Sequence, residues 1–245
     1  MTTQQLRSIP ALHMRGISAE TQALFRIVAG KGYGKAQDKD GFRYPTFDEE
    51  GKRRLRWKHV DSHAAAGDKY GWEIMPDGTA QTWKIYVADY KALREAVERK
   101  NGVLYWCAGE VDVWTLHAAS ASGSYPPAAS AFGEKNIPEN IAEWLKSIGV
   151  NRVVYYPDLD KPGLAAAAKL YRLLSGSGMA LELYRLPGDI GSKLDLNALW
   201  QQVKFNKDAF WKALKTCPAI DDIEMYDDSL DHVQAPQQNS NGEMP

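Results

Sequence analysis

The sequence predicts an α/β fold in which a parallel sheet carries helices on both faces and follows a small α+β unit. From Asp89 onward, short apolar runs alternate with helical patterns, as is typical of βαβ units with right-handed crossovers. Before about residue 88 the chain instead has short aromatic runs punctuated by Pro, Gly and Asp-Gly. We therefore expect a basic α+β unit at 1–88, an α/β domain at 89–218 and an acidic tail or linker at 219–245.

Within the first unit, Ser18 is expected to cap a helix that runs to about Ala29, where the GKGYGK segment ends it. Residues 41–60 read GFRYPTFDEEGKRRLRWKHV, and two short runs that flank the turn-like DEEGK predict a β-hairpin. Short aromatic segments follow in YGWEIMP and DGTAQTWKIYV.

The second unit alternates between the two patterns throughout. The strands are expected at GVLYWCA (102–108), AASAF (128–132), NRVVYYP (151–157) and MALELYRLP (179–187). The helices are expected at 89–100, 109–120, 137–149 and 163–178.

Composition excludes several classes of protein. The chain is 44% apolar and 25% charged, an ordinary balance for a soluble domain, and no apolar run approaches the roughly 20 residues of a membrane helix. The N-terminus has no apolar signal core, so we expect a cytoplasmic protein without a membrane partner. Cys107 and Cys217 lie far apart, which excludes a zinc ribbon and favours two reduced thiols.

Charge is unevenly distributed along the chain. The formal net charge is −1, yet residues 219–245 hold seven acids and no Lys or Arg, so residues 1–218 are net basic. The tail is also rich in Gln, Asn, Pro and Ser, a composition typical of disordered segments and linkers.

Asp158 and Asp160 follow the third strand of the α/β unit in the stretch VVYYPDLDKPGL. Ligands of open parallel sheets bind beyond the carboxyl ends of the strands. Two neighbouring carboxylates repel unless a cation neutralises them, and Mg²⁺ prefers such oxygen ligands. Gly163 allows the turn into the next helix, whose N-terminus favours phosphate. Simple capping of that helix by an aspartate is the alternative.

Two motifs together resemble the Toprim family, the metal-binding domain of DNA primases, topoisomerases and related nucleases. DLDKPG follows the third strand, and LYWCAGEVDVWTL spans the first strand and its turn. The resemblance covers about residues 102–203 and implies that Asp158 and Asp160 are the paired metal aspartates. Gly109 and Asp112 fit the first turn, and SAFGEKNIP resembles the second strand and turn of phage primase-like members.

The segment YRLPGDIGSKLDLNALW resembles the part of Toprim domains in which a lysine and an acid follow the fourth strand. The resemblance implies that Lys193 contacts phosphate and that Asp195 supports a metal ion. It also implies Mg²⁺ as the cofactor, with Mn²⁺ as an alternative.

Ala108 is the main departure from the family, because it occupies the position of the family glutamate, which acts as a general acid or base or helps to hold metal. Three explanations remain open. The alanine is a deliberate inactivating substitution, or the chain is a natural degenerate member, or Glu110 takes over after a local shift.

The first unit resembles the basic domain that precedes Toprim in primases and holds single-stranded template. The hairpin also resembles that of phage-type primase-helicases, which implies nucleic-acid contacts by Arg53, Arg54, Arg56, Trp57 and Lys58. A solvated hairpin face is the alternative for the basic residues. Base stacking and core packing are the two alternatives for the aromatic residues, which are Tyr44, Phe47, Trp57, Tyr70, Trp72 and Trp83.

The resemblance thus implies a DNA primase that joins ribonucleoside triphosphates into short RNA primers on single-stranded DNA during replication. It would come from a phage or mobile element, act in the bacterial host cytoplasm, and work as part or partner of a replicative helicase, with the acidic tail as linker. Two alternatives are a non-catalytic DNA-binding module that recruits a helicase and a metal-dependent Toprim nuclease.

Overall fold

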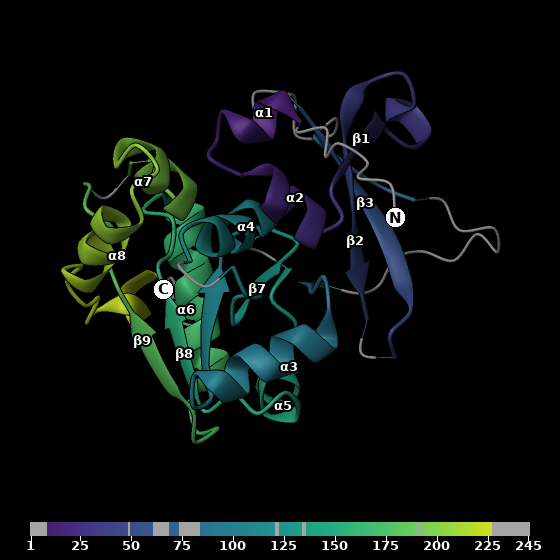
Figure 1. Ribbon diagram of the computed structural model, residues 1–245. Coiled ribbons are helices and arrows are strands. Elements are labelled where there is room, and N and C mark those ends of the chain that lie inside the picture. Colours follow the sequence, from purple (N-terminus) through teal and green to yellow (C-terminus); the bar gives the residue numbers. More distant parts are fainter. Residues whose placement is uncertain are drawn as a thin grey trace, which may run out of the picture.

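Two sheets form the framework of the protein (Figure 1). The computed structural model describes residues 9–48, 50–60, 69–73, 84–120, 123–133, 136–189, 191–192 and 194–226. Within these ranges a four-stranded sheet has the order β1-β2-β3-β4, and a five-stranded sheet has the order β5-β7-β6-β8-β9.

The first sheet is antiparallel and contains the predicted hairpin. Its strands are β1 (Val28–Lys31), β2 (Asp40–Phe47), β3 (Arg53–His59) and β4 (Tyr70–Trp72). Phe47 pairs with Arg53 at the turn, which confirms the hairpin. Three short helical segments accompany this sheet: α1 (Pro10–His13), α2 (Ala19–Leu24) and the 3₁₀ helix η1 (Gly34–Ala36).

The predicted helix that begins after Ser18 is shorter than expected. Ser18 does cap α2, because its hydroxyl accepts a hydrogen bond from the Thr21 N–H at 3.2 Å. The helix ends at Leu24, however, and Arg26 adopts a left-handed conformation with φ of 53°. That reversal turns the chain into β1, so the prediction of helix to Ala29 is wrong at its C-terminal end.

The second sheet contains all four strands predicted for the α/β unit. These are β6 (Val103–Cys107), β7 (Ala128–Ala131), β8 (Arg152–Tyr155) and β9 (Ala180–Leu183), and they are mutually parallel. The short strand β5 (Ile85–Tyr86) adds antiparallel to β7. This strand precedes residue 88, and the domain boundary placed there remains a prediction.

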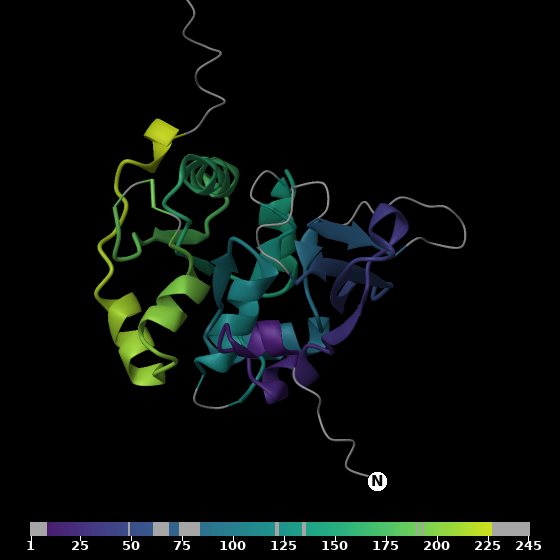
Figure 2. The same cartoon turned by 90° about the horizontal axis from the view of Figure 1, so that it is seen from above.

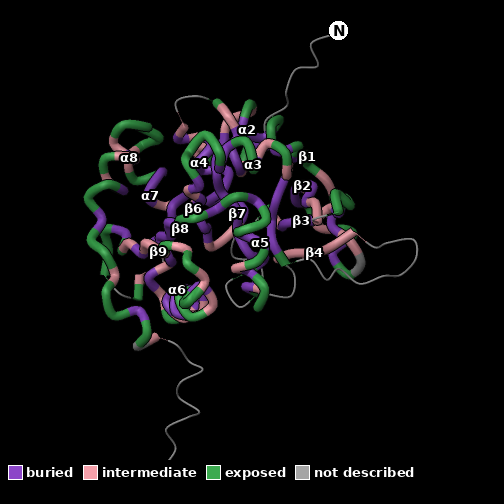
Figure 3. The backbone as a smooth tube through the Cα atoms, turned by 90° about the horizontal axis from the view of Figure 1, so that it is seen from below, coloured by how far each residue is buried: buried purple, intermediate pink, exposed green. Residues whose placement is uncertain are grey.

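Helices cover both faces of this sheet, as predicted (Figures 2 and 3). One face carries α5 (Ile141–Ser147) and α6 (Lys161–Leu174). The other carries α3 (Tyr90–Arg99), α4 (Glu110–Ala118), α7 (Leu196–Gln202) and α8 (Lys207–Lys215). A last 3₁₀ helix, η4 (Ile223–Tyr226), packs on α6.

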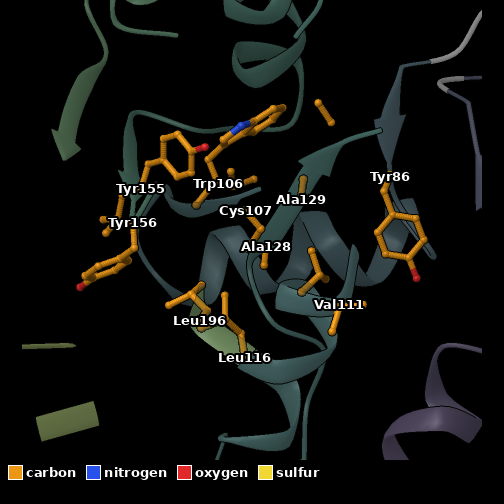
Figure 4. Close-up of a cluster of buried hydrophobic side chains, with 14 of the residues drawn as sticks. Tyr86, Trp106, Cys107, Val111, Leu116, Ala128, Ala129, Tyr155, Tyr156 and Leu196 are labelled. Atoms are coloured by element: carbon orange, nitrogen blue, oxygen red, sulfur yellow. The ribbon is translucent and has the colours of Figure 1, made fainter. Parts of the chain in front are cut away.

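A continuous apolar core joins the two sheets. Tyr44 and Phe42 of β2 contact Trp114 of α4 edge to face, with ring centroids 5.0 and 5.9 Å apart. The core continues through the second sheet, where Trp106, Cys107 and Tyr155 lie between the helical layers (Figure 4). Because aromatic pairs contribute about 0.5–1.5 kcal/mol beyond their buried area, these contacts hold the sheets firmly against one another.

The strand order creates a switch point between β6 and β8. β6 is followed by α4 and connects to β7 on one side, whereas β8 is followed by α6 and connects to β9 on the other. Ligands bind open α/β sheets at such a point, beyond the carboxyl ends of the strands. Ala108 follows β6 and Asp158 follows β8, so both lie at this edge. No helix of the described residues is both long and apolar enough to cross a membrane.

Candidate active site between the two sheets

The loop that carries Asp158 and Asp160 is tied down on several sides. Asp160 caps α6, because its Oδ1 accepts a hydrogen bond from the Gly163 N–H at 3.0 Å. The Leu159 carbonyl accepts a hydrogen bond from the Gly191 N–H at 2.6 Å. A Cβ on Gly163 would lie 2.4 Å from the Asp158 carbonyl oxygen, so glycine is required for the close approach of loop and helix. Capping, the alternative to a ligand role, therefore does occur at Asp160, and it leaves the second carboxylate oxygen for another contact.

Asp112 and Asp195 form a second pair of carboxylates. Asp112 accepts hydrogen bonds from the backbone N–H groups of Gly109 at 3.2 Å and Asn197 at 3.3 Å. Asp195 caps α7 through the Ala198 N–H. Burial and the neighbouring Asp195 charge raise the pKa of Asp112 to about 8, with Arg15 acting in the opposite direction. Such a pair gains from a cation that neutralises the charge.

Ala108 lies between the end of β6 and Gly109, the residue that caps α4. Its methyl group can neither bind a metal ion nor transfer a proton. Glu110 is buried and already engaged, because the Tyr44 hydroxyl donates a hydrogen bond to its Oε1 at 2.5 Å and the Lys58 ammonium lies 3.8 Å away. These contacts argue against a shift of Glu110 into the place of the missing glutamate at Ala108.

The charge state of Glu110 reflects these partners. Burial alone would raise its pKa, but the positive charges of Lys58 and Arg56 and the Tyr44 hydrogen bond outweigh it and lower the pKa from 4.5 to about 2. Burial also lowers the pKa of Lys58, and Glu110 opposes that shift. Glu110 is therefore an ionised partner for the basic hairpin and is poorly suited to act as a general base near neutral pH.

The alternation of β3 divides the basic hairpin residues between two faces. Arg54, Arg56 and Lys58 are buried, whereas Arg53 is exposed. Since successive strand residues point to opposite faces, the three buried cations share one face, which is the face that meets Glu110. The buried cations are thus not the solvated hairpin face that was the alternative.

Trp57 requires a correction, because the structure buries its side chain fully. Its indole Nε1 donates a hydrogen bond to the Gly30 carbonyl at 3.1 Å, and a Cβ on Gly41 would lie 2.2 Å from Nε1. Core packing against glycine backbone explains Trp57, and its ring is inaccessible to a base. Tyr44 is buried in the same sense, while Tyr70 and Trp72 remain half-buried.

Arg56 is the most unusual cation of the site. Its guanidinium carbon lies 4.3 Å from the Phe132 ring centroid, 4.4 Å from that of Tyr70 and 5.2 Å from that of Trp72. Its Nε and Nη1, like Nη1 of Arg54, are buried without a hydrogen-bond partner among the described residues. A buried charged group without hydrogen bonds is costly, so these nitrogens mark a point of the structure where hydrogen-bonding capacity is unmet.

Arg15 joins the site although nothing in its local sequence marks it. Its Nε donates to Asn197 Oδ1 at 2.8 Å, and Asn197 Nδ2 donates to the Arg15 carbonyl at 3.0 Å. Its positive charge affects the pKa of Asp112 and that of Lys58. The partner lies 182 residues away, so only the tertiary fold reveals this contact.

Two residues of the expected site are not covered by the structure. Lys193 and Trp83 lie outside the described residues. Within the described ranges, no group of three or more His, Cys, Asp and Glu side chains is arranged to hold a metal ion. The carboxylates instead occur in pairs, which suits Mg²⁺, since this ion is often bound by one or two carboxylates together with substrate phosphates.

Comparison with solved structures identifies the fold. No family model matches the chain, and no curated protein does. The zinc-binding and RNA polymerase domains of the Aquifex aeolicus primase align with a TM-score of 0.62 at 14% identity, over 86% of this chain and 56% of that one.

Two further structures agree. The RNA polymerase domain of the Mycobacterium tuberculosis primase DnaG, bound to double-stranded DNA with a 6-nucleotide overhang, gives a TM-score of 0.61 at 14% identity, over 91% of this chain and 78% of that one. The primase fragment of the bacteriophage T7 primase-helicase gives 0.55 at 17% identity, over 85% and 74%. The chain therefore has the fold of DnaG-type primase polymerase domains, which confirms the expected α/β architecture.

Proposed function

We propose that this chain is the primer-synthesising part of a DNA primase of the phage or primase-helicase type. The observation that carries the proposal is the set of buried, unpaired guanidinium nitrogens of Arg54 and Arg56, which lie on the face of β3 that meets the α/β domain. A triphosphate or a nucleic-acid backbone would supply the anionic partners that these nitrogens lack.

The cationic residues are proposed to bind phosphate. Arg54, Arg56 and Lys58 would contact a ribonucleoside triphosphate or the template backbone, and Arg15, fixed by Asn197, would add a further positive charge. Lys193 is proposed to contact phosphate as well, on the Toprim resemblance alone. Exposed Arg53 would contribute only long-range attraction for nucleic acid.

The carboxylates are proposed to serve a divalent cation. Asp158 and Asp160 beside β8, with Asp112 and Asp195 beside β6 and α7, are hard oxygen donors of the kind that Mg²⁺ or Mn²⁺ binds. When bound, the ion would neutralise charge on the transferred phosphoryl group. Gly163 and Asn197 would keep the two carboxylate pairs in place, since each contacts one of them directly.

The proposed partners are single-stranded DNA, ribonucleoside triphosphates and a replicative helicase. Support comes from the neighbours, of which one is a DNA-bound primase domain and another a fragment of a primase-helicase. A cytoplasmic location in a bacterial host fits this role. The chain spans 56% of the length of the Aquifex primase chain, so the activity of a whole primase is part of the proposal and not a finding.

A non-catalytic DNA-binding module is the second candidate, and Ala108 favours it. This residue places a methyl group at the end of β6, where the resemblance to Toprim primases implies a glutamate. Glu110 cannot replace that glutamate, because Tyr44 and Lys58 hold it in place. Such a module would keep the cationic site and bind DNA without joining nucleotides.

The test is incorporation of labelled ribonucleotides on single-stranded DNA with Mg²⁺, together with DNA binding in EDTA. Short RNA products would support the primase proposal. Binding that EDTA leaves unchanged, with no products even from Ala108→Glu, would support the non-catalytic module. Cleavage of the DNA without nucleotides would contradict both and favour the Toprim nuclease.

A further inference from the structure

A cavity of about 440 Å³ opens at the end of the second sheet opposite the candidate active site. It lies among the C-terminal ends of α3, α4 and α8, near the amino end of β6, whereas the candidate site lies beyond the carboxyl ends of β6 and β8. Nothing in the proposed primase chemistry uses this cavity.

The cavity combines an apolar floor with a basic rim. Its floor includes Leu116, Pro126 and the ring of Trp211, which Nε1 fixes by donating to the Ala119 carbonyl at 2.9 Å. Its charged lining residues among those described are all cationic: Arg99, Lys100 and Lys215. The C-terminal ends of α3, α4 and α8 each carry roughly half a negative charge. Together they offset only part of the three positive side-chain charges, so the rim stays positive.

This combination selects the chemistry of a ligand. Carboxylates would pair with the rim, and an aliphatic side chain would fill the floor. No Asn, Gln, Asp or Glu lines the cavity among the described residues, so few side chains are present to read the edge of a nucleobase. An acidic peptide with an apolar residue fits this lining better than a nucleotide does.

We propose that the cavity binds residues 227–233 of a second copy of this chain. That segment reads DDSLDHV, in which three aspartates surround Leu230, and it contains no Lys or Arg. Its charge is complementary to the rim, and Leu230 matches the apolar floor.

The position of η4, where the described chain ends, excludes binding of this segment within one molecule. The described chain ends at Tyr226 in η4, which packs on α6, the helix on the opposite face of the sheet from α4 and α8 (Figure 2). The four residues 227–230 span at most about 14 Å when extended. They would have to pass a helix roughly 10–12 Å in diameter and the sheet as well, so Leu230 reaches only the cavity of a neighbour.

Intermolecular spin-label broadening tests the proposal on the full chain. A chain without isotope labels carries a spin label on the cysteine of the Ser229→Cys variant, and it is mixed with ¹⁵N-labelled chain. The label attaches selectively to the new cysteine, because Cys107 and Cys217 are both buried. We expect the indole signal of Trp211, assigned by Trp211→Phe, to lose intensity selectively among the eight tryptophans as concentration rises.

Matched variants decide the outcome. Two changes should raise the chain concentration at which the broadening appears by at least about tenfold. One is Lys215→Glu combined with Lys100→Glu, and the other is Leu230→Ala in the spin-labelled chain. Lys212→Glu, the same change on an exposed residue of α8 outside the cavity, should leave it unchanged. A Trp211 signal that stays unperturbed at all concentrations would overturn the proposal. A Trp211 signal that shifts on addition of ATP, but is not affected by the spin-labelled tail, would overturn it as well.

Discussion

The Tyr44 hydroxyl of β2 donates a hydrogen bond to Glu110 Oε1 of α4 at 2.5 Å, and this contact joins the two sheets at the edge of the candidate site. Both side chains are buried, and Lys58 on the neighbouring strand completes the group. Glu110 therefore has a defined task that differs from catalysis: it holds the basic hairpin against the α/β domain.

Removal of Glu110 should destabilise the protein strongly. Glu110→Ala leaves Lys58 buried without its partner and should lower the free energy of unfolding by about 3–5 kcal/mol. Tyr44→Phe removes one hydrogen bond to a charged group and should lower it by about 1.5–3 kcal/mol. Urea unfolding measures both. Glu95→Ala, which removes an exposed partner of Lys91, is the control and should change the value by less than about 0.5 kcal/mol.

Stability should depend on pH through the same carboxylate. The pKa of Glu110 is 4.5 in the unfolded reference and about 2 in the folded protein, so ionised Glu110 stabilises the fold above pH 4.5. That contribution should disappear as the pH falls from 4.5 toward 2. Unfolding free energies measured across this range should converge for the wild type and Glu110→Gln, whereas parallel curves would contradict the assigned shift.

Arg56 should matter more than Arg53 for anion binding. Arg56→Gln removes buried, unpaired donors and should weaken binding of a ribonucleoside triphosphate at least about tenfold, because a charge-assisted hydrogen bond contributes about 1.5–3 kcal/mol. Arg53→Gln, an equal charge change on the opposite face of β3, should weaken binding only slightly. Calorimetric titration measures both, and thermal unfolding checks that each variant is folded. Equal effects would contradict the division of the strand into two faces.

Gly163→Ala should displace the loop that carries Asp158. The added Cβ would lie 2.4 Å from the Asp158 carbonyl oxygen, and overpacking of this kind costs about 1–3 kcal/mol. The variant should also weaken Mn²⁺ binding, which paramagnetic relaxation of water can measure. Gly109→Ala meets no atom within 4 Å and should cost less than about 1 kcal/mol, so similar losses in the two variants would contradict this explanation.

The alternation of strands and helices after Asp89 was predictable because each parallel strand there is a short apolar run with its own helix. The first unit was harder. Its second helix ended early because Arg26 takes a left-handed conformation, which local propensity does not reveal. The two-residue period of β3 separates Arg54, Arg56 and Lys58 from Arg53 and Trp57, but only the tertiary fold shows that the first face meets Glu110 of α4.

The site was predictable only where its residues follow strands. Asp158 and Asp160 lie in the loop that follows β8, so their place at the sheet edge followed from topology. The contact between Arg15 and Asn197 could not be found in this way, since the two residues meet across 182 positions and Arg15 lies in no motif that the sequence reveals. The sequence allows Glu110 as a substitute for the glutamate missing at Ala108, whereas the actual partners of Glu110 come from β2 and β3.

The most direct test of the primase proposal compares the chain with Ala108→Glu and with Ala108→Glu/Asp158→Asn in ribonucleotide incorporation on single-stranded DNA with Mg²⁺. We expect short RNA products from Ala108→Glu at a rate well above that of the unaltered chain, and we expect the double variant to lose them. If Ala108→Glu binds the DNA and remains folded yet makes no more product than the double variant, the proposed active site is contradicted.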